Sequence, residues 1–516
     1  MVDLSGPIIS TFIAYLLVMV LIGVWVYRRT KTLSDFALGG RSLNAPTAAL
    51  SAQASDMSGW LLMGLPGAVY AAGIGEAWIA IGLAAGTYLN WLFVAPRLRT
   101  YTERAHNSIS LSAYFESRFE DRTNLLRIVS ALIIGVFFTL YVASGLVAGG
   151  LLFETIFGVE PDIAITVAVI VIVVYTFLGG FLAVSFTDFI QGTLMFLAMV
   201  VVPIAVVLSI GGFTPLFDGV EATSPNLLNW IDEAAFTAGE GWATGSSLSF
   251  VAIAGLLAWG LGYFGQPHIL ARFMGIRSAA HVATARRIGT GWVLVTLAAA
   301  VFIGLAGVAY LDEPLANSET VFLVLVQDLF NPWVAGLILA AVLAAVMSTA
   351  DSQLLVASTA VTEDFYRRYF KRQASDKELV WVGRIAVVLV AIIAYYLALR
   401  GGSVLDIVAY AWAGFGSAFG PIVILSLYWS RMTWAGALAG MVTGATVVLV
   451  WENIDWAGIG NESIASWGDV YSMLPGFGLA LLAAIVFGNL GRRPEREWIG
   501  NYRDEPAEGT EETAVK

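Results

Sequence analysis

Long apolar stretches, separated by short polar segments, constrain this chain more than any other feature of its sequence. A helix needs about 20 consecutive apolar residues to cross the hydrocarbon core of a bilayer. The chain is 58% hydrophobic and only 13% charged, whereas a soluble domain is about 25% charged. We therefore predict an all-α polytopic protein of the lipid bilayer. Hydropathy predicts thirteen spans, at approximately residues 7–27, 44–70, 75–95, 126–152, 161–182, 188–211, 247–268, 288–310, 333–358, 380–399, 404–428, 433–451 and 471–490.

The sequence also excludes several classes of function. The chain contains no cysteine, which excludes disulfides, thiolate metal sites and a cysteine nucleophile. It contains no metal-ligand cluster, phosphate-binding loop or nucleophile elbow. An intramembrane aspartyl protease would need a second motif-bearing aspartate, and a sensory protein would need a kinase or receiver segment after Leu490; neither pattern occurs. The chain is predicted to be no enzyme and to bind no nucleic acid.

The basic residues predict an orientation in the membrane. If the N-terminus is outside, almost every Arg and Lys falls in an inside segment, with Arg400 as the exception, and the outer loops are acidic. This asymmetry follows the positive-inside rule. The first span is predicted to be a retained helix because no basic residue precedes it, whereas Arg28, Arg29 and Lys31 follow it. The net charge of −11 fits either a surface tuned for solubility or a salt-rich habitat.

Two of the predicted spans contain residues that break helices. Residues 51–60, SAQASDMSGW, place Asp56 among serines and a glycine inside the second span, and residues 258–268, AWGLGYFGQPH, crowd three glycines and a proline into the seventh. Glycine costs about 1 kcal/mol and proline about 3 kcal/mol in a helix interior. Both spans are therefore predicted to be unwound near the middle. Close packing of glycine-rich helices is the alternative explanation.

The spacing of the two broken spans predicts an inverted repeat. Five spans separate them, so they run in opposite directions, as in transporters whose site lies between two interrupted helices. The predicted organisation has five parts: an extra N-terminal helix and inner loop (1–43), a first five-helix repeat (44–212), a second, inverted repeat (247–429), two C-terminal helices (430–490) and a disordered cytoplasmic tail (491–516).

Oxygen atoms gather where a cation could bind. A broken span leaves carbonyl groups that lipid cannot satisfy, and a hard cation prefers oxygen ligands. Residues 346–353, VMSTADSQ, add the adjacent hydroxyls of Ser348 and Thr349 and the carboxylate of Asp351. Alternatively, the two hydroxyls bond back to the preceding helical turn.

Several ionisable residues lie within the predicted spans. An acid inside a membrane is a functional candidate by default, and Asp56 lies about twelve residues into its span. Asp188 opens the sixth span, so capping of that helix is an alternative function for it. Asp406, near the outer end of its span, is expected to be solvated or capping. His268 is expected to be a structural histidine at the inner interface rather than a proton relay.

Aromatic residues on the same segments predict a surface for an organic solute. Trp259 and Tyr263 are four residues apart on one face of the seventh span, and Tyr141 lies at mid-depth in the fourth. Such rings offer apolar area with a polar handle. The backbone amides of Ser58 and Gly59 could receive a carboxylate, since the N-terminus of a half-helix attracts anions.

Five motifs resemble one transporter family. They are GGRSL at 39–43, ASDMSGWLLMGLPGAVY at 54–70, GYFGQPHILARFM at 262–274, AAVMST at 344–349 and YAWAGFGSAFGP at 410–421. Together they resemble the sodium/solute symporter family, and within it most closely the bacterial sodium/proline symporters. The resemblance extends from about Asp35 to Met432 and weakly to both ends.

This resemblance implies a LeuT-type fold of two inverted five-helix repeats and a set of binding residues. The implied sodium ligands are the carbonyls of Ala54, Met57 and Ala345 and the hydroxyls of Ser348 and Thr349. Asp56 is implied to support sodium binding, Asp188 to lie on the inner sodium exit route and Arg41 to affect coupling from the inner side. The implied solute pocket consists of Tyr141, Trp259, Tyr263 and Pro267, with Ser58 and Gly59 nearby. No match is implied for Asp351, which either tunes the sodium route or is solvated.

The resulting expectation is a secondary active transporter of a bacterial or archaeal cytoplasmic membrane that couples inward sodium flow to uptake of L-proline. Sodium is then the coupling ion, and the protein is expected to be a monomer. The alternative is the same fold carrying another small solute, such as pantothenate, a sugar or another amino acid.

Overall fold

A computed structural model describes residues 5–27, 37–178, 180–371, 373–454 and 470–494. The predicted basic residues at 28–31, part of the predicted acidic loop at 455–469 and most of the predicted tail (495–516) lie outside the described residues. The α-helices are α1 (Ser5–Tyr27), α3 (Ala45–Asp56), α4 (Leu65–Ala72), α5 (Ala77–Leu89), α6 (Ala95–Arg104), α7 (Leu111–Arg118), α8 (Leu125–Phe157), α9 (Pro161–Leu178), α10 (Phe181–Ile210), α11 (Phe213–Thr223), α12 (Phe250–Gly262), α13 (Pro267–Gly275), α14 (Val282–Tyr310), α15 (Val321–Leu329), α16 (Pro332–Thr359), α17 (Asp376–Ala398), α18 (Val404–Tyr428), α19 (Trp434–Asn453) and α22 (Met473–Phe487).

Short 3₁₀ or π turns and one pair of strands complete the chain. The turns are η1 (Gly39–Arg41), η2 (Trp60–Gly64), η3 (Ile74–Glu76), η4 (Asn90–Val94), η5 (Pro225–Leu228), η6 (Tyr263–Gly265), η7 (Ala279–His281), η8 (Ser318–Thr320) and η9 (Ala360–Phe370), and the strands are β1 (Asp232–Thr237) and β2 (Gly241–Ser247).

The described helices confirm a polytopic membrane protein. Nine of them are long and apolar enough to cross a membrane, and α12–η6 with α13 form a tenth candidate bent by 45°. Three shorter apolar helices, Trp60–Ala72, Pro161–Val174 and Met473–Phe487, lie where the second, fifth and thirteenth spans are predicted. Thus each predicted span coincides with a helix or a broken pair of helices, although the total of thirteen crossings stays a prediction.

The all-α prediction is wrong in one segment. Strands β1 and β2 pair antiparallel, with Phe236 opposite Trp242, in the loop between the two predicted repeats. Gly239 and Gly241 have positive φ angles of 74° and 106°, which favour glycine and allow the tight reversal. Trp242 donates its indole N–H to the carbonyl of Tyr70 at 2.8 Å, which holds the hairpin on the end of α4.

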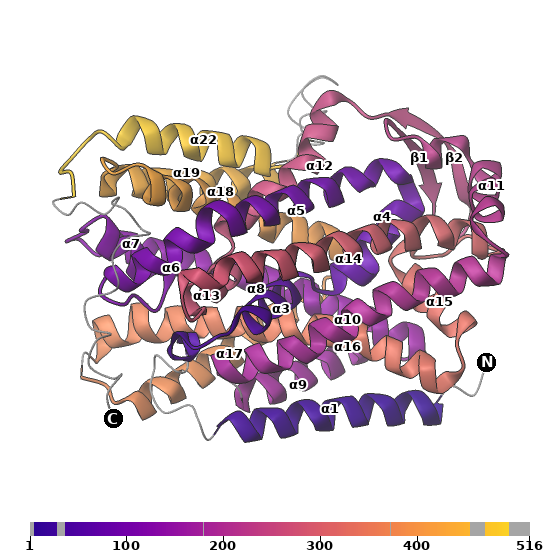
Figure 1. The fold of residues 1–516 in the computed structure, drawn as a ribbon, viewed down its shortest axis with the longest axis horizontal. Helices are drawn as coiled ribbons and strands as arrows, with labels where there is room; N and C mark the ends of the chain where they lie inside the picture. Colours follow the sequence, from indigo (N-terminus) through magenta and orange to yellow (C-terminus); the bar gives the residue numbers. More distant parts are fainter. Residues whose placement is uncertain (1–4, 28–36, 179, 372, 455–469, 495–516) are drawn as a thin grey trace.

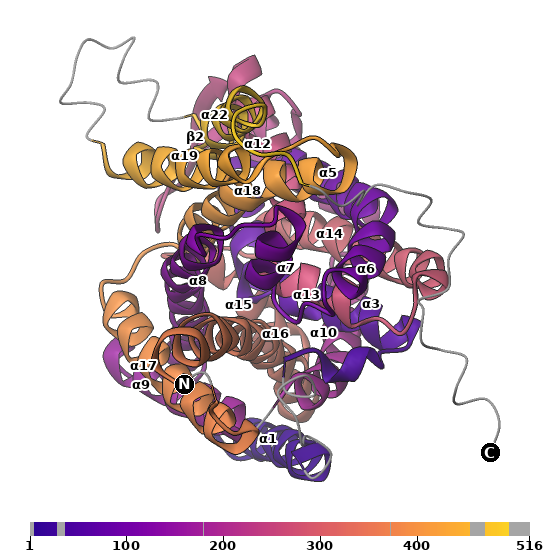
Figure 2. The ribbon, with the colours of Figure 1, turned by 90° about the vertical axis from the view of Figure 1, so that its left-hand side faces the viewer.

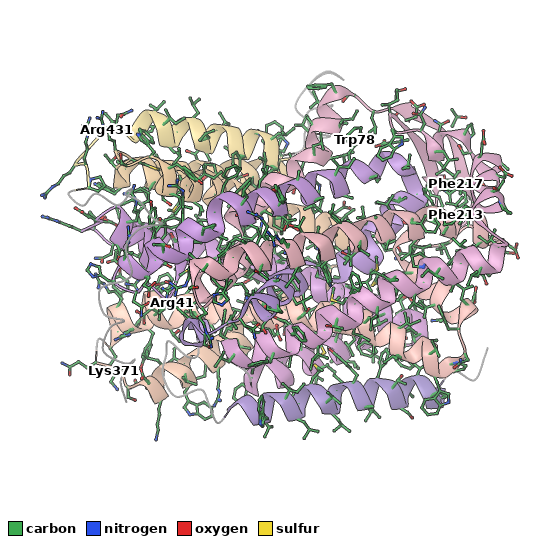
Figure 3. The ribbon with its side chains drawn as sticks, viewed as in Figure 1. Arg41, Trp78, Phe213, Phe217, Lys371 and Arg431 are labelled. Carbon is green, nitrogen blue, oxygen red and sulfur yellow. The ribbon has the colours of Figure 1, made fainter. Side chains whose placement is uncertain are left out.

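The helices run roughly side by side along the long axis of the molecule (Figure 1). The β1–β2 hairpin marks one end, which we call the hairpin end, and Arg41, Lys371 and Arg431 lie at the other, which we call the basic end (Figure 3). Helix α1 begins at the hairpin end and α22 ends at the basic end (Figure 1). The described chain therefore starts and finishes on opposite sides.

Helix α16 lies in the centre of the bundle. Its most apolar window is 83% buried, compared with 28% for α1, and it packs against α1, α8, α10 and α17. Viewed from the basic end, α3, α10, α13 and α16 lie in the middle, with α9 and α17 on one side and α18, α19 and α22 on the other (Figure 2). The two broken spans, α3–η2–α4 and α12–η6–α13, thus cross the protein interior.

Both predicted interruptions are confirmed. Helix α3 ends at Asp56, and Met57 has non-helical angles of φ −80° and ψ 83° before η2 begins at Trp60. Gln266 is extended (φ −79°, ψ 108°) between η6 and α13, as expected for a residue that precedes a proline. The carbonyl of Tyr263, freed by the second break, accepts a hydrogen bond from Asn90 Nδ2 at 2.9 Å.

Candidate transport site

The hydroxyls of α16 contact the last turn of α3. Ser348 Oγ donates to the Ala54 carbonyl at 2.7 Å and approaches the Ala345 carbonyl at 3.2 Å. Thr349 Oγ1 lies 3.3 Å from the same Ala54 oxygen. Hydrogen bonds to the preceding helical turn therefore do not fully account for these two hydroxyls, because both also contact a different helix. Four of the five implied sodium ligands form one oxygen cluster, and Met57, the fifth, is buried at the adjacent break.

Asp56 is enclosed between the two broken spans. Its side chain is fully buried, and its Oδ2 accepts a hydrogen bond from Tyr263 Oη at 2.5 Å. Its main-chain carbonyl, free because α3 ends there, accepts bonds from Trp60 Nε1 at 3.1 Å and from Tyr141 Oη at 3.3 Å. Its Oδ1 has no hydrogen-bond partner among the described residues. The acid thus joins the two breaks and keeps one oxygen for a cation, water or solute.

Aromatic rings surround the two breaks. Trp259 lies 6.3 Å from Trp60 between ring centroids and stacks on Tyr471 at 5.5 Å. Tyr263 meets Trp412 edge-to-face at 5.2 Å. Sequence reasoning missed Trp412 and Tyr471 as members of this group. The motif at 410–421 contains Trp412 and could have indicated this residue. The position of the Trp412 indole, however, depends on how α18 packs.

Trp412 connects α18 to both sides of the second break. Its Nε1 donates to the Trp259 carbonyl at 2.7 Å, and its carbonyl accepts from Gln266 Nε2 at 3.2 Å. Its indole also fills the space beside Gly262, where any Cβ would collide with the ring. Glycine at this position therefore permits the close approach of α12 and α18.

Ser58 and Gly59 directly precede η2, between Asp56 and Trp60 in the chain. Both are buried, and Gly59 is so close to α8 that an added Cβ would lie 2.6 Å from the Cβ of Ala148. Pro267 lies elsewhere: it begins α13 and lines a cavity of only about 20 Å³ with Ala271 and Val356 toward the basic end. The structure therefore separates Pro267 from the cavity that Trp259 lines.

Arg41 lies at the basic end (Figure 3). Its guanidinium donates to Asn107 Oδ1 at 2.8 Å and Thr102 Oγ1 at 3.1 Å. It also donates to the carbonyls of Met274 at 2.7 Å and Ser108 at 2.8 Å. Arg41 thus joins the chain before α3 to α6, to the loop after α6 and to the end of α13.

Asp188 belongs to a second buried polar group, one helical turn from the oxygen cluster. Its Oδ2 accepts from Ser51 Oγ at 2.6 Å and from Arg272 Nη2 at 3.1 Å. The capping alternative is wrong, because α10 begins at Phe181 and Asp188 lies two turns inside it. Asp351 is fully buried, which excludes solvation, one of the two roles that the sequence offers for it.

His268 and Asp406 are also placed by the structure. The predicted interfacial position of His268 is wrong, since the ring is fully buried and lies 6.0 Å from Tyr141 between centroids. Neither ring nitrogen has a hydrogen-bond partner among the described residues. Asp406 lies in the first turn of α18, where its backbone N–H is capped by Ser403 Oγ at 3.2 Å.

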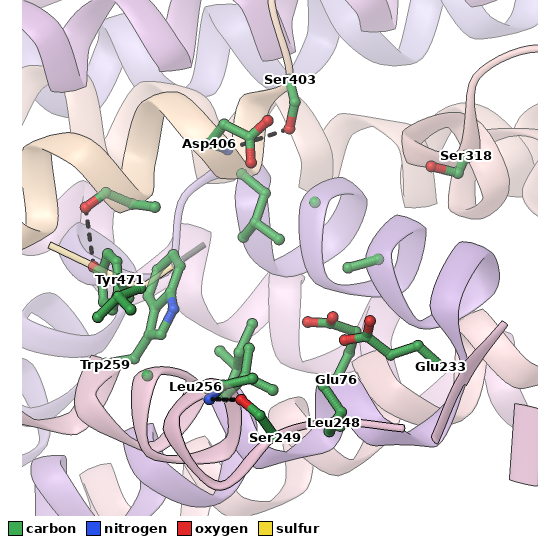
Figure 4. A pocket seen from close by; sticks show the side chains of 18 of the residues that line it. Glu76, Glu233, Leu248, Ser249, Leu256, Trp259, Ser318, Ser403, Asp406 and Tyr471 are labelled. Atoms are coloured by element: carbon green, nitrogen blue, oxygen red, sulfur yellow. Dashed lines mark hydrogen bonds between the residues drawn. The ribbon is translucent and has the colours of Figure 1, made fainter. Parts of the chain in front are cut away.

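A cavity of about 800 Å³ leads from the hairpin end to the aromatic group. Trp259 and Tyr471 line it at one side, and the carboxylates of Glu76 and Glu233 meet at another (Figure 4). No described lining residue is Lys, Arg or His. Burial raises the pKa of Glu319, which accepts hydrogen bonds from the N-terminal amides of α18. The acidic lining residues are Glu76, Glu233, Glu319, Asp406 and Glu452.

Residues 36–444 match the sodium:solute symporter family. The chain belongs to the sodium:solute symporter family. As a member of that family it is a multi-pass membrane transporter with sodium as its coupling ion. Residues of both broken spans, the α16 hydroxyls and most of the acidic cavity fall within the matched region.

Two bacterial relatives are similar over nearly the whole chain. The "Sodium/proline symporter" of Escherichia coli (strain K12) is 48% identical over 499 residues, which cover 95% of this chain and 94% of the relative. The "High-affinity proline transporter PutP" of Bacillus subtilis (strain 168) is 47% identical over 490 residues, which cover 94% of this chain and 98% of the relative.

Two solved structures share the fold of this chain. A Na⁺-coupled sialic acid symporter in a substrate-bound, outward-open state matches with a TM-score of 0.76 at 21% identity, over 95% of this chain and 99% of that chain. MhsT in complex with L-phenylalanine matches with a TM-score of 0.52 at 14% identity, over 86% and 97% of the two chains. At these identities the likeness concerns the fold alone.

Proposed function

We propose that the chain couples inward sodium flow to uptake of L-proline. The observation that carries this proposal is full-length similarity: relatives named as sodium/proline symporters and proline transporters are 44–48% identical over 94% or more of this chain. Sodium/proline symport is therefore the activity that the family match and the relatives support together.

The charge of the cavity supports a solute without net negative charge. The cavity has five acidic lining residues and no basic one among those described. Such a field attracts sodium and tolerates a zwitterion such as proline, but repels an anion. It therefore opposes pantothenate, one of the alternative solutes, because pantothenate carries a carboxylate and no amine. A sugar or another zwitterionic amino acid is not opposed by this field.

The oxygen cluster between α3 and α16 is the proposed sodium site. The ligands would be the carbonyls of Ala54, Met57 and Ala345 with the hydroxyls of Ser348 and Thr349. The contacts of 2.7 to 3.3 Å between these two helices support the assignment, because sodium needs several oxygens around one point. Asp56 would favour the cation through its charge and Asp188 would lie on the inner exit route.

The proposed proline site lies between the two breaks. Tyr141, Trp259 and Tyr263 would enclose the apolar ring, and the amides of Ser58 and Gly59 would face the carboxylate. Bonds from Tyr141 and Tyr263 to Asp56 support a site shared with the ion. Pro267 would act by breaking the seventh span rather than by touching the solute, and Arg41 would act from the inner side.

We further propose that the chain crosses the membrane thirteen times and has a LeuT-type fold of two inverted five-helix repeats. The repeats would be residues 44–212 and 247–429, and residues 1–43, 430–490 and 491–516 would lie outside them. The protein would be a monomer in the cytoplasmic membrane of a bacterium or archaeon. The hairpin end would face outward and the basic end the cytoplasm, as the positive-inside rule favours. The described chain begins and ends on opposite sides of the molecule (Figure 1), which supports an odd number of crossings.

Alternating access would then come from movement of one bundle against the other. A cavity of about 800 Å³ opens at the hairpin end, whereas the cavity beside Pro267 on the basic side measures only about 20 Å³. These volumes support an arrangement open to the outside and closed to the cytoplasm.

The deciding experiment is uptake of radiolabelled L-proline into proteoliposomes with an inward sodium gradient, and with sodium equal on both sides. We expect accumulation only with the gradient, and competition by unlabelled proline but not by pantothenate. Proline uptake at the same rate with and without the sodium gradient would refute the coupling. Sodium-driven uptake of another labelled solute, without proline uptake, would instead support the alternative of a sodium symporter for that solute.

A further inference from the structure

Trp259, which is part of the proposed proline site, lies among other aromatic rings. Its ring centroid is 6.3 Å from that of Trp60 and 5.5 Å from that of Tyr471, and it stacks on Tyr471 with an angle of 23° between the two planes. Trp259 is only 4% exposed, and its indole N–H makes no hydrogen bond within the described part of the chain. The neighbouring rings therefore determine where the indole lies.

These rings connect the first break to the end of the chain. Trp60 begins η2 and donates its Nε1 to the Asp56 carbonyl at 3.1 Å. Trp259 lies on α12 of the second broken span, and Tyr471 directly precedes α22. Helix α22 is one of the two C-terminal helices that lie outside the proposed repeats. A residue outside the repeats is thus in direct contact with the proposed proline site.

Tyr471 is itself held by three helices. Its hydroxyl donates to the Ala409 carbonyl on α18 at 2.9 Å. Trp451 on α19 donates its Nε1 to the carbonyl of the preceding residue, Val470, at 2.9 Å. On α12, an added Cβ at Gly255 would lie 3.3 Å from the Cβ of Tyr471, so the small residue permits a close approach of the two segments. Tyr471 is therefore a fixed support for the Trp259 ring.

The stacked pair forms part of the wall of the outer cavity. Trp259 and Tyr471 both line the cavity of about 800 Å³, and they lie against each other at one side of it (Figure 4). Without the Tyr471 ring, the indole of Trp259 could move into the space that this ring leaves. The space available to a solute beside Trp259 would then be larger.

We propose that Tyr471 is a positioning residue that sets the size of the proline pocket through Trp259. This inference rests on the proposed sodium/proline symport. A five-membered ring fits against an indole that Tyr471 supports, whereas a six-membered ring, with one more methylene, needs the indole to move. One methylene in an apolar pocket gives a discrimination of about 10- to 200-fold. Helix α22 thus contributes to the solute specificity of a site that the two repeats build.

The test compares two solutes that differ by one methylene. Uptake of radiolabelled L-proline into proteoliposomes with an inward sodium gradient is inhibited by unlabelled L-proline or by L-pipecolate, its six-membered homologue. The ratio of the two half-inhibitory concentrations measures the selectivity for ring size. Tyr471→Leu should lower this ratio at least about fivefold, because the pocket can then accept the extra methylene. The half-saturating sodium concentration should stay at the parental value.

Two further variants separate the ring from other effects. Tyr471→Phe keeps the aromatic ring and removes only the bond to the Ala409 carbonyl, so it should keep the parental ratio. Tyr395→Leu is the matched control, because Tyr395 on α17 also has a ring contact, with Tyr396 at 5.6 Å, and a hydroxyl contact, with Thr166 at 3.0 Å. Tyr395 does not line the cavity, so its replacement should leave the ratio unchanged.

A folded Tyr471→Leu protein with the parental ratio would overturn the proposal, as would an equal fall in the Tyr395→Leu control. If Tyr471→Leu does not fold, Tyr471→Met replaces it, because methionine fills irregular space without offering a flat ring. The same fall in the ratio is expected, and a parental ratio would equally overturn the proposal.

A second measurement needs no solute. The melting temperatures of Tyr471→Leu, Trp259→Leu and the double variant are compared with that of the parent. Because the contact between the two rings can be lost only once, the double variant should lose less than the sum of the two single losses. Strictly additive losses would overturn the proposal. A failure of proline uptake in the parent protein would count against the proposed function alone.

Discussion

Replacement of Ser348 by alanine is predicted to raise the sodium requirement of transport far more than it lowers the amount of protein. Ser348 Oγ lies 2.7 Å from the Ala54 carbonyl and 3.2 Å from the Ala345 carbonyl, so its loss removes an oxygen from the centre of the cluster. A bond between a neutral group and a charged one contributes about 1.5–3 kcal/mol. Since 1.4 kcal/mol is a factor of ten, the sodium concentration for half-maximal uptake should rise by about 10- to 100-fold. Thr349→Ala should have a smaller effect, of up to about tenfold, because its hydroxyl lies 3.3 Å from Ala54.

The assay is initial proline uptake in proteoliposomes over a range of sodium concentrations at saturating proline. Ser358→Ala is the matched control: this buried serine of α16 bonds back to the Leu355 carbonyl at 2.8 Å and lies outside the cluster. Its sodium dependence should match that of the parent. An unchanged sodium dependence in both Ser348→Ala and Thr349→Ala, at normal protein levels, would refute the cation assignment.

Three further substitutions probe the two breaks. Tyr263→Phe removes the hydroxyl that donates to Asp56 at 2.5 Å. Because an unsatisfied buried acceptor costs about 1–3 kcal/mol or more, the half-saturating sodium concentration should rise at least about fivefold. The same sodium dependence of uptake in the variant and the parent would contradict this. Trp412→Phe removes the 2.7 Å hydrogen bond to the Trp259 carbonyl. It should raise the proline KM, measured by uptake at fixed sodium, with little change in sodium dependence. Gly59→Ala places a methyl group against α8 and should lower both the melting temperature and the maximal rate; a stable, fully active variant would show that η2 can move away.

The positions of the spans and of their breaks could be predicted because both are local properties. Apolar run length determines where a helix can lie in lipid, and the crowding of glycine and proline at 258–268 weakens a helix wherever it packs. The hairpin of β1 and β2 was missed because its hydrophobic pattern is short and its stability comes from Trp242 and Tyr70, which are 172 residues apart. The expected position of His268 was wrong for a related reason: its proximity to a span end in the sequence did not reveal the cover provided by α8.

The sequence by itself determined that this chain is a polytopic membrane protein with two interrupted spans and candidate oxygen ligands at two of its segments. Only the tertiary structure decided which of those oxygens meet, since Ala54 and Ser348 are 294 residues apart and their 2.7 Å contact depends on the packing of α3 against α16. It also decided that Asp188 meets Arg272, with a distance of 3.1 Å between Asp188 Oδ2 and Arg272 Nη2. Apolar patterning specifies which residues enter the membrane, whereas the distances between polar groups inside it depend on how whole helices cross and how far each is rotated.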